Sequence, residues 1–230
     1  MLLNIKQLYV CKLAASDGEV GRIKDFYFDD KSWAVRYLVA DTGTWLSGRQ
    51  VLLSPHAFGR WNRAGNVLPL NLTRKQIEGG PAIASHEPVS RQHEIDYFRH
   101  YGWPAYWYGG GMWGIGPFPL ATKEVRAEAY ASPEHRQADL NLRSTKAVTG
   151  YQIHAVDGVL GTVSGFKVDD QNWAILDLVV EAGHWYAGKE ILIPVSNIER
   201  ISYEGSTVFV TLTEADLQRT LANTVAKAAS

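Results

Sequence analysis

The sequence predicts a mainly all-β protein of two small β-barrels from an internal duplication, with short helices and an aromatic-rich connecting arm. Three observations predict this fold: a self-match at an offset of 140 residues, alternating hydrophobicity within each copy, and an intervening segment that matches neither copy. We expect the first barrel at 1–80 and the arm at 81–142. The second barrel is expected at 143–220, and a C-terminal tail at 221–230.

The self-match runs without a gap from Asp17–Ile77 to Asp157–Leu217 and keeps 18 of 61 residues. Typical residue frequencies would give roughly four identities by chance. Most of the retained residues are glycines, turn aspartates or large apolar residues, which β structure needs at its turns and in its core. The residues expected to form these turns and cores are Asp17, Gly18, Gly21, Trp33, Gly43, Trp45, Asp157, Gly158, Gly161, Trp173, Gly183 and Trp185.

Each copy reads as a series of short strands separated by turns. In the first copy, a strand over 20–28 follows an Asp-Gly turn, and the Asp29-Asp30 turn separates it from a strand over Ala34–Ala40. Strands over Arg49–Leu53 and Val67–Leu72 follow, and Thr73 is expected to cap a short helix. The matching elements of the second copy are strands over Ala174–Val180 and Lys189–Ile193 and a helix capped by Thr213.

These motifs resemble the PRC-barrel family, named for the photosynthetic reaction centre. The similarity rests on the pattern DGEVGRIKDFYFDD, WAVRYLVAD and GRQVLLSP and on its second copy, DGVLGTVSGFKVDD, WAILDLVVE and GKEILIPVSNI. The resemblance implies a small bent barrel, as in the reaction-centre H subunit and in ribosome maturation factors, that binds proteins and carries no catalytic motif. Two features depart from those relatives: a transmembrane helix and an RNA-processing domain are both missing from the sequence pattern.

Composition limits the classes of partner. Lys and Arg total 23 and Asp and Glu total 24, so no overall charge attracts the chain to a phosphate backbone, and no obligate nucleic acid partner is expected. One cysteine and an N-terminus without a signal-peptide pattern predict a location in the reducing cytoplasm. A bacterial source is implied by the family resemblance alone. A basic patch that contacts RNA is a minor alternative. It would use Arg22, Lys24, Arg36, Arg49, Arg60 and Arg63.

The arm carries nine aromatic residues within 97–118, and a helix starting near Ser90 should turn Ile95 and Phe98 inward. Glycines and prolines argue against a membrane span over 101–122. The rings could pack on the chain's own barrels, exchange between protomers of a homodimer, dock another protein, or adsorb to a membrane interface. The possible interface residues are Tyr97, Phe98, Tyr101, Trp103, Tyr106, Trp107, Tyr108, Trp113 and Phe118.

The sequence favours no catalytic, metal or cofactor site. His86, His93 and His100 recur every seven residues, but two helical turns are too far apart for one ion, so a solvated or interface face is expected. His56 is expected at the surface and Cys11 as a buried structural thiol. The repeated aspartates, Asp29-Asp30 and Asp169-Asp170, are expected to close turns rather than to serve as acid and base.

Together these features predict a non-enzymatic adaptor or scaffold with a protein partner of unknown identity. A homo-oligomer, such as a homodimer that exchanges the arm, is one of the arrangements that the sequence leaves open. One alternative is a photosynthesis-related peripheral protein associated with a membrane complex such as a reaction centre or light-harvesting complex. Another alternative is a small-ligand or metal-binding protein. The expectation of an adaptor or scaffold rests on the family resemblance.

Overall fold

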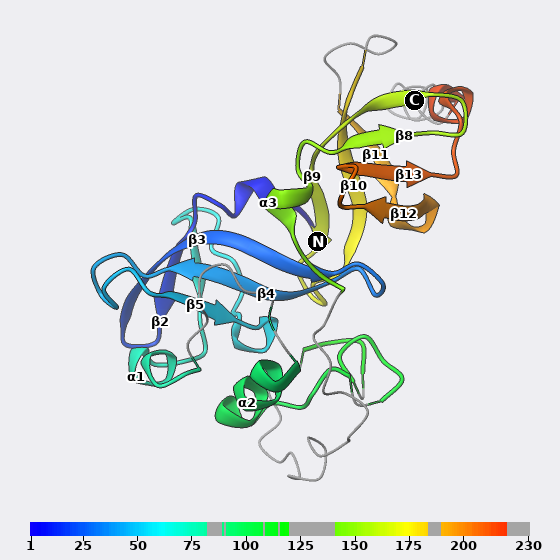
Figure 1. The fold of residues 1–230 in the computed structure, drawn as a ribbon. Helices are drawn as coiled ribbons and strands as arrows, with labels where there is room; N and C mark the ends of the chain where they lie inside the picture. Colours follow the sequence, from blue (N-terminus) through cyan, green and yellow to red (C-terminus); the bar gives the residue numbers. More distant parts are fainter. Residues whose placement is uncertain are drawn as a thin grey trace. The chain divides into compact units, whose positions relative to one another are not determined.

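The computed structural model describes residues 1–81, 89, 91–107, 109–114, 116–119, 141–183 and 190–219. In these residues the protein is mainly β, with two sheets and a few short helices, as predicted (Figure 1). The chain divides into two compact units. Unit 1 comprises Met1–Ser144 with Asp169–Ala174, and unit 2 comprises Thr145–Val168 with Ile175–Ser230. Unit 1 therefore contains the first copy, the described part of the arm and the turn that carries Trp173.

The sheet of unit 1 has the strand order β5-β4-β3-β2-β6, with β7 paired to β3. Neighbouring strands are antiparallel except β2 and β6, which are parallel, a pairing that the sequence did not predict. The elements are β1 (Leu2–Asn4), η1 (Ile5–Gln7), β2 (Lys12–Ala15), β3 (Gly18–Asp29), β4 (Ala34–Asp41), β5 (Gln50–Leu53), η2 (Pro55–Ala57), β6 (Val67–Pro69), α1 (Arg74–Glu78), α2 (Arg91–Tyr101) and β7 (Leu142–Ser144).

Unit 2 arranges its strands in the order β11-β10-β9-β8-β13-β12, again with one parallel pair, β8 and β13. Its elements are α3 (Thr145–Val148), β8 (Gln152–His154), β9 (Val159–Asp169, whose last residue belongs to unit 1), β10 (Ile175–Ala182), β11 (Glu190–Pro194), η6 (Val195–Asn197), β12 (Ile198–Ser202) and β13 (Thr207–Val210). Residues 214–219 are helical. The strand pairings of the described residues do not join the ends of either sheet, so barrel closure stays a prediction.

The two sheets repeat the same register at positions 140 residues apart. Val39 of β4 lies opposite Leu52 of β5, and Val179 of β10 lies opposite Leu192 of β11. The pairing of β3 with β4 skips Arg36, and the pairing of β9 with β10 skips its counterpart, Leu176. Residues with the same place in the two copies therefore have the same place in the two sheets.

The predicted turns are confirmed. The Asp29 carboxylate accepts hydrogen bonds from the backbone N–H groups of Lys31 (2.9 Å) and Ser32 (3.2 Å), and Asp169 caps the equivalent turn in the same way. The tryptophan that follows each turn has a positive φ, 53° at Trp33 and 59° at Trp173. The duplicated aspartates thus form turns, as their spacing indicated.

The predicted helix starts are confirmed as well. Thr73 and Gln76 form a capping box at the N-terminus of α1, and Thr213 accepts a hydrogen bond from the Asp216 backbone N–H (3.2 Å). Such caps satisfy backbone N–H groups that the helix itself leaves unpaired.

Strand β4 is buried on both faces, which a strand at the surface of a small barrel would not be. All seven residues of Ala34–Ala40 are buried, including Arg36 and Tyr37. The inner face packs into the core with Phe26, Phe28 and other residues of β3. The outer face must therefore have a second cover, and the arm provides it.

Gly21 allows β3 to come close to the end of β4. Its φ is +147°, and a Cβ at this position would lie 2.0 Å from the carbonyl oxygen of Asp41. Gly161 repeats this geometry against Glu181. Only glycine fits such a contact, which explains why both copies retain it.

We predict that Gly21→Ala destabilises the protein by at least ~2 kcal/mol more than Gly43→Ala. Gly43 is the matched control because its φ is +53° but nothing lies within 4 Å of an added Cβ. Urea unfolding followed by circular dichroism measures both values. Equal losses of unfolding free energy would contradict the steric account.

Candidate functional site

The outer face of the β4–β5 pair is covered by helix α2 and the residues that follow it, and buried polar side chains meet at this contact. Tyr97 of α2 reaches the sheet edge with its hydroxyl group. This group accepts a hydrogen bond from the Ser54 backbone N–H (2.8 Å) and donates one to the Leu52 carbonyl (3.2 Å). One side chain thus satisfies two backbone groups of an edge strand, which would otherwise be open to pairing.

Arg36 lies at the bulge of β4 and is 3% exposed. Its guanidinium donates to the Met112 carbonyl (2.6 Å) and the Ser32 hydroxyl (2.9 Å), and it lies 3.5 Å from the Asp29 carboxylate. The guanidinium also stacks over the Tyr106 ring, with its carbon 3.8 Å from the ring centroid. A buried charge is tolerated only when it is paired and hydrogen-bonded, and the arm supplies part of that pairing.

Glu94 of α2 is the second buried charged residue of this cluster, with no exposed surface. One of its carboxylate oxygens accepts hydrogen bonds from the hydroxyls of Tyr37 (2.6 Å) and Tyr106 (2.7 Å). Burial and the adjacent Glu94 carboxylate hold the pKa of Tyr37 well above its ordinary value, so Tyr37 stays a hydrogen-bond donor. The sheet thus provides the donor and the helix provides the acceptor.

His56 is buried among aromatic rings, which corrects the expectation of a surface histidine. It stacks on Trp103 (centroids 5.4 Å apart) and meets the edges of Phe98 and Trp113, while its Nδ1 lies 2.9 Å from the Ser54 Oγ. Burial, reinforced by the positive charge of Arg36, lowers the pKa of His56 to about 3. The ring is therefore neutral in the folded protein at pH 7.

The side chains of this cluster are buried and packed against one another. Ser54 and His56 are hydrogen-bonded like a nucleophile and its base, but both are buried under the arm, so a substrate has no path to the Ser54 hydroxyl in this arrangement. Arg36 and Glu94 are each held by neighbouring protein groups. Chemically, these residues can fix the arm to the sheet.

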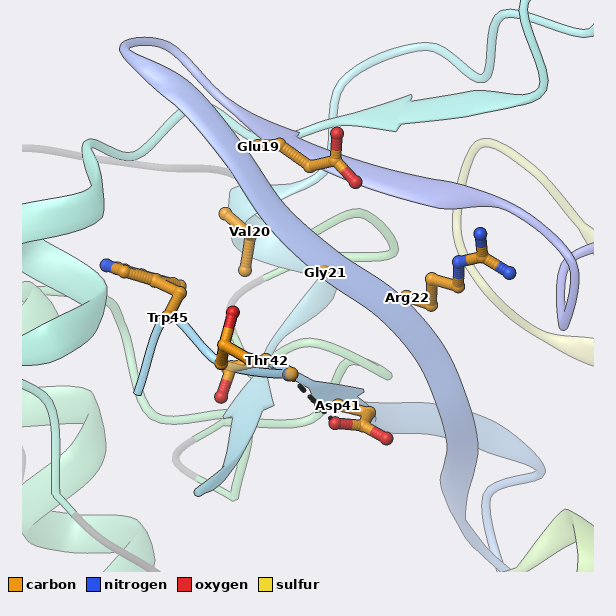
Figure 2. A pocket seen from close by; sticks show the side chains of 9 residues that line it. Glu19, Val20, Gly21, Arg22, Asp41, Thr42 and Trp45 are labelled. Atoms are coloured by element: carbon orange, nitrogen blue, oxygen red, sulfur yellow. Dashed lines mark hydrogen bonds between the residues drawn. The ribbon is translucent and has the colours of Figure 1, made fainter. Parts of the chain in front are cut away.

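A separate shallow hollow of about 390 Å³ lies beside the Gly21 contact (Figure 2). Its charged lining residues are Glu19, Arg22 and Asp41, and the Asp41 carboxylate accepts a hydrogen bond from the Gly43 backbone N–H (2.9 Å). Gly21, Gly43 and Trp45, which also line the hollow, are retained in the second copy, whereas its three charged residues are not.

The structure places the predicted aromatic residues within unit 1. Tyr97, Phe98, Trp103, Tyr106 and Trp113 are buried, which agrees with packing on the chain's own β structure. Tyr101 and Trp107 are partly exposed, Phe118 is 43% exposed, and Tyr108 lies outside the described residues. The predicted inward orientation of Ile95 and Phe98 is confirmed.

The repeat residues have mixed placements: Trp33 and Trp45 are only partly buried, and Gly21 and Gly161 lie within strands. Trp173 is buried against Phe58, with ring centroids 4.7 Å apart, and Gly18 and Gly158 have nearly the same φ, +153° and +156°. Trp185 lies outside the described residues. Cys11 is buried, and its thiol donates to the Asn66 side-chain oxygen (2.9 Å).

The pairing of Arg36 with the arm was not predicted from the sequence, where this residue was grouped with a basic surface patch. The burial of Arg36 corrects that alternative. A signal was present: an arginine and a tyrosine interrupt an apolar strand where the second copy has Leu176 and Asp177, and the arm contains an unmatched Glu94.

In the described part of unit 2, the equivalent outer face is only partly covered: Val179 is buried, but the leucines beside it are exposed. Leu176 and Leu192, the counterparts of Arg36 and Leu52, are 41% and 45% exposed. Asp177 occupies the position of Tyr37 and is partly exposed. The two copies thus have the same strand register but different surfaces.

Comparisons with known proteins leave the family open. No family model matches the chain, and no curated protein matches it. The resemblance to the PRC-barrel family therefore stays a prediction. No group of three potential metal ligands occurs among the described residues, and none of their helices has the length and hydrophobicity needed to cross a bilayer.

We predict that Tyr97→Phe lowers the free energy of unfolding by about 1–3 kcal/mol, because the Ser54 N–H is left buried without a partner. Tyr101→Phe is the matched control, since it removes a hydroxyl from a partly exposed position of the same helix; a loss below about 0.5 kcal/mol is expected. Chemical denaturation measures both. Indistinguishable losses would show that the Tyr97 bond is unimportant.

We further predict a pH dependence of stability that comes from His56. The folded protein holds this ring neutral down to about pH 3, whereas the unfolded chain binds a proton below the ordinary pKa of 6.5. Stability is thus fully present above pH 6.5 and is lost as the pH falls towards 3. Between pH 7 and 5, the wild type should lose about 1–2 kcal/mol relative to His56→Phe. Parallel pH profiles of unfolding free energy would refute this assignment.

Proposed function

We propose that the protein is a non-enzymatic adaptor or scaffold that binds another protein, built from two PRC-type barrels that arose by duplication. One observation carries the proposal. The outer face of the β4–β5 pair holds a segment of polypeptide, whereas the equivalent face of the β10–β11 pair exposes leucines where its counterpart is covered.

The contact between the arm and the β4–β5 pair has the composition of a protein–protein interface. Aromatic rings and a buried arginine form its centre, and tyrosine hydroxyls pair with backbone and carboxylate groups. Interface hot spots are enriched in these same residue types. The repeat therefore offers an outer face that is suited to holding a helix.

The charged groups also favour a binding role. Asp29 caps a turn, Arg36 and Glu94 lie within the packed cluster, and His56 is neutral and enclosed by rings. Each of these titratable groups has a structural partner. The proposal therefore assigns these groups to packing and binding rather than to catalysis.

The adaptor function predicts a stoichiometric complex. The tagged full-length chain, isolated from its own cells at native expression, should retain a protein that re-forms a complex with the purified chain at a fixed ratio. Light scattering after size exclusion should give the mass of the 25.6-kDa chain plus that of the partner. The tag alone is the control.

Two results would contradict the adaptor function. In the first, no protein re-forms a complex with the purified chain. In the second, native mass spectrometry shows a small molecule bound stoichiometrically to the chain, and the chain turns that molecule over.

A further inference from the structure

The outer face of β10–β11 is related residue by residue to the face that α2 covers. Opposite residues of an antiparallel pair lie on the same side of the sheet, so Asp177, Val179 and Glu181 share a face with Pro194, Leu192 and Glu190. In β4–β5 the corresponding residues are Tyr37, Val39 and Asp41 with Ser54, Leu52 and Gln50. The way in which α2 covers β4–β5 therefore indicates what kind of segment could bind to β10–β11.

Two leucines expose apolar surface on this face, although Val179 itself is buried. Leu176 and Leu192 are each more than 40% exposed, whereas Arg36 and Leu52 at the matching positions are 3% exposed. The difference comes from the arm, because Tyr106 and Trp113 lie over Arg36 and Tyr97 lies over Leu52. No described residue of unit 2 is seen to cover Leu176 or Leu192 in the same way.

The face of β10–β11 carries a hydrogen-bond acceptor where the face of β4–β5 carries a donor. In unit 1 the sheet donates through Tyr37 to the Glu94 carboxylate on the helix. In unit 2 the sheet carries Asp177 at that position, and an ionised carboxylate only accepts hydrogen bonds. A helix on this face would therefore need a donor, lysine or arginine, where α2 has Glu94.

The rim of the face is acidic as well. Glu181 and Glu190 are exposed and lie directly opposite each other across the two strands. Like charges in this position repel each other, and a cation bound over them would relieve the repulsion. Lys167 lies opposite Asp177 on β9 and offsets one of the three carboxylates. The remaining negative charge favours a basic partner.

We propose that the outer face of β10–β11 docks an amphipathic helix of a protein partner that combines apolar or aromatic side chains with lysine or arginine. The spacing is that of Glu94, Tyr97 and Phe98 in α2: a basic residue at i and apolar residues at i+3 and i+4. The inference rests on the adaptor function and specifies the chemistry of the partner.

The probe is a peptide with the sequence of α2, Arg91–Tyr101, carrying Glu94→Lys. It is held helical by a covalent link between the exposed positions 96 and 100, because an unsupported peptide of this length is barely helical. The same peptide with Glu94 is the reference. The full-length chain should bind the Glu94→Lys peptide at least ~5-fold more tightly than the reference, and added salt should weaken this binding.

Variants of the full-length chain locate the binding. Leu176→Asn with Leu192→Asn should weaken binding of the Glu94→Lys peptide by about tenfold, and Asp177→Asn should reduce the preference for the basic peptide. Val159→Asn is the matched control, since Val159 is also exposed but belongs to β9. NMR shifts on peptide addition should fall on 176–194 and leave 36–54 unchanged.

Several outcomes would overturn the proposal: equal binding of the two peptides, unchanged binding by the leucine variant, or shifts confined to unit 1. A dimer of the wild-type chain that dissociates on Leu192→Asn would make a second copy the occupant, and would equally overturn it. If the purified partner complex forms but survives Leu176→Asn with Leu192→Asn, the adaptor function stands and the assigned face is wrong. If no complex forms at all, the adaptor function itself fails.

Discussion

The contact of the Tyr97 hydroxyl with the edge of β5 sets the arrangement of the rest of unit 1. It satisfies the Ser54 N–H and the Leu52 carbonyl at once, and so brings α2 onto the outer face of the sheet. Once the helix lies there, Arg36 and Glu94 are enclosed and must be paired within the protein. The aromatic residues exclude water from these pairs, and the same exclusion keeps His56 neutral.

The two copies share one backbone arrangement but have different outer faces. Gly21 and Gly161, the capped aspartate turns and the skipped residue of β4 and β10 are shared, because they determine how the chain bends. The outer-face residues are free to differ, since they depend on what covers them. Tyr37 suits an internal helix that presents a carboxylate, Glu94, and Asp177 suits an external helix that presents a cation. Divergence on one face of a repeated sheet can thus separate an internal contact from an external one.

Much of the fold could be predicted from sequence because turns and caps depend on neighbouring residues. Asp29, Thr73 and the alternating strands are of this kind. The cover of β4 could not be predicted, because hydrophobic periodicity does not show which distant segment packs on a strand. For the same reason His56 and Arg36 were expected at the surface. Both lie under the arm, and the aromatic residues of the arm could have packed on any of several surfaces.

The most direct test of the central claim, that one outer face is covered and its counterpart is only partly covered, is carbene footprinting of the free full-length chain with mass spectrometry at residue resolution. Leu52 and Leu192 occupy the same position in the two sheets and serve as internal references for each other. The account predicts strong labelling of Leu192 and Leu176 and protection of Leu52. Equal labelling of Leu52 and Leu192, or protection of both, would contradict it.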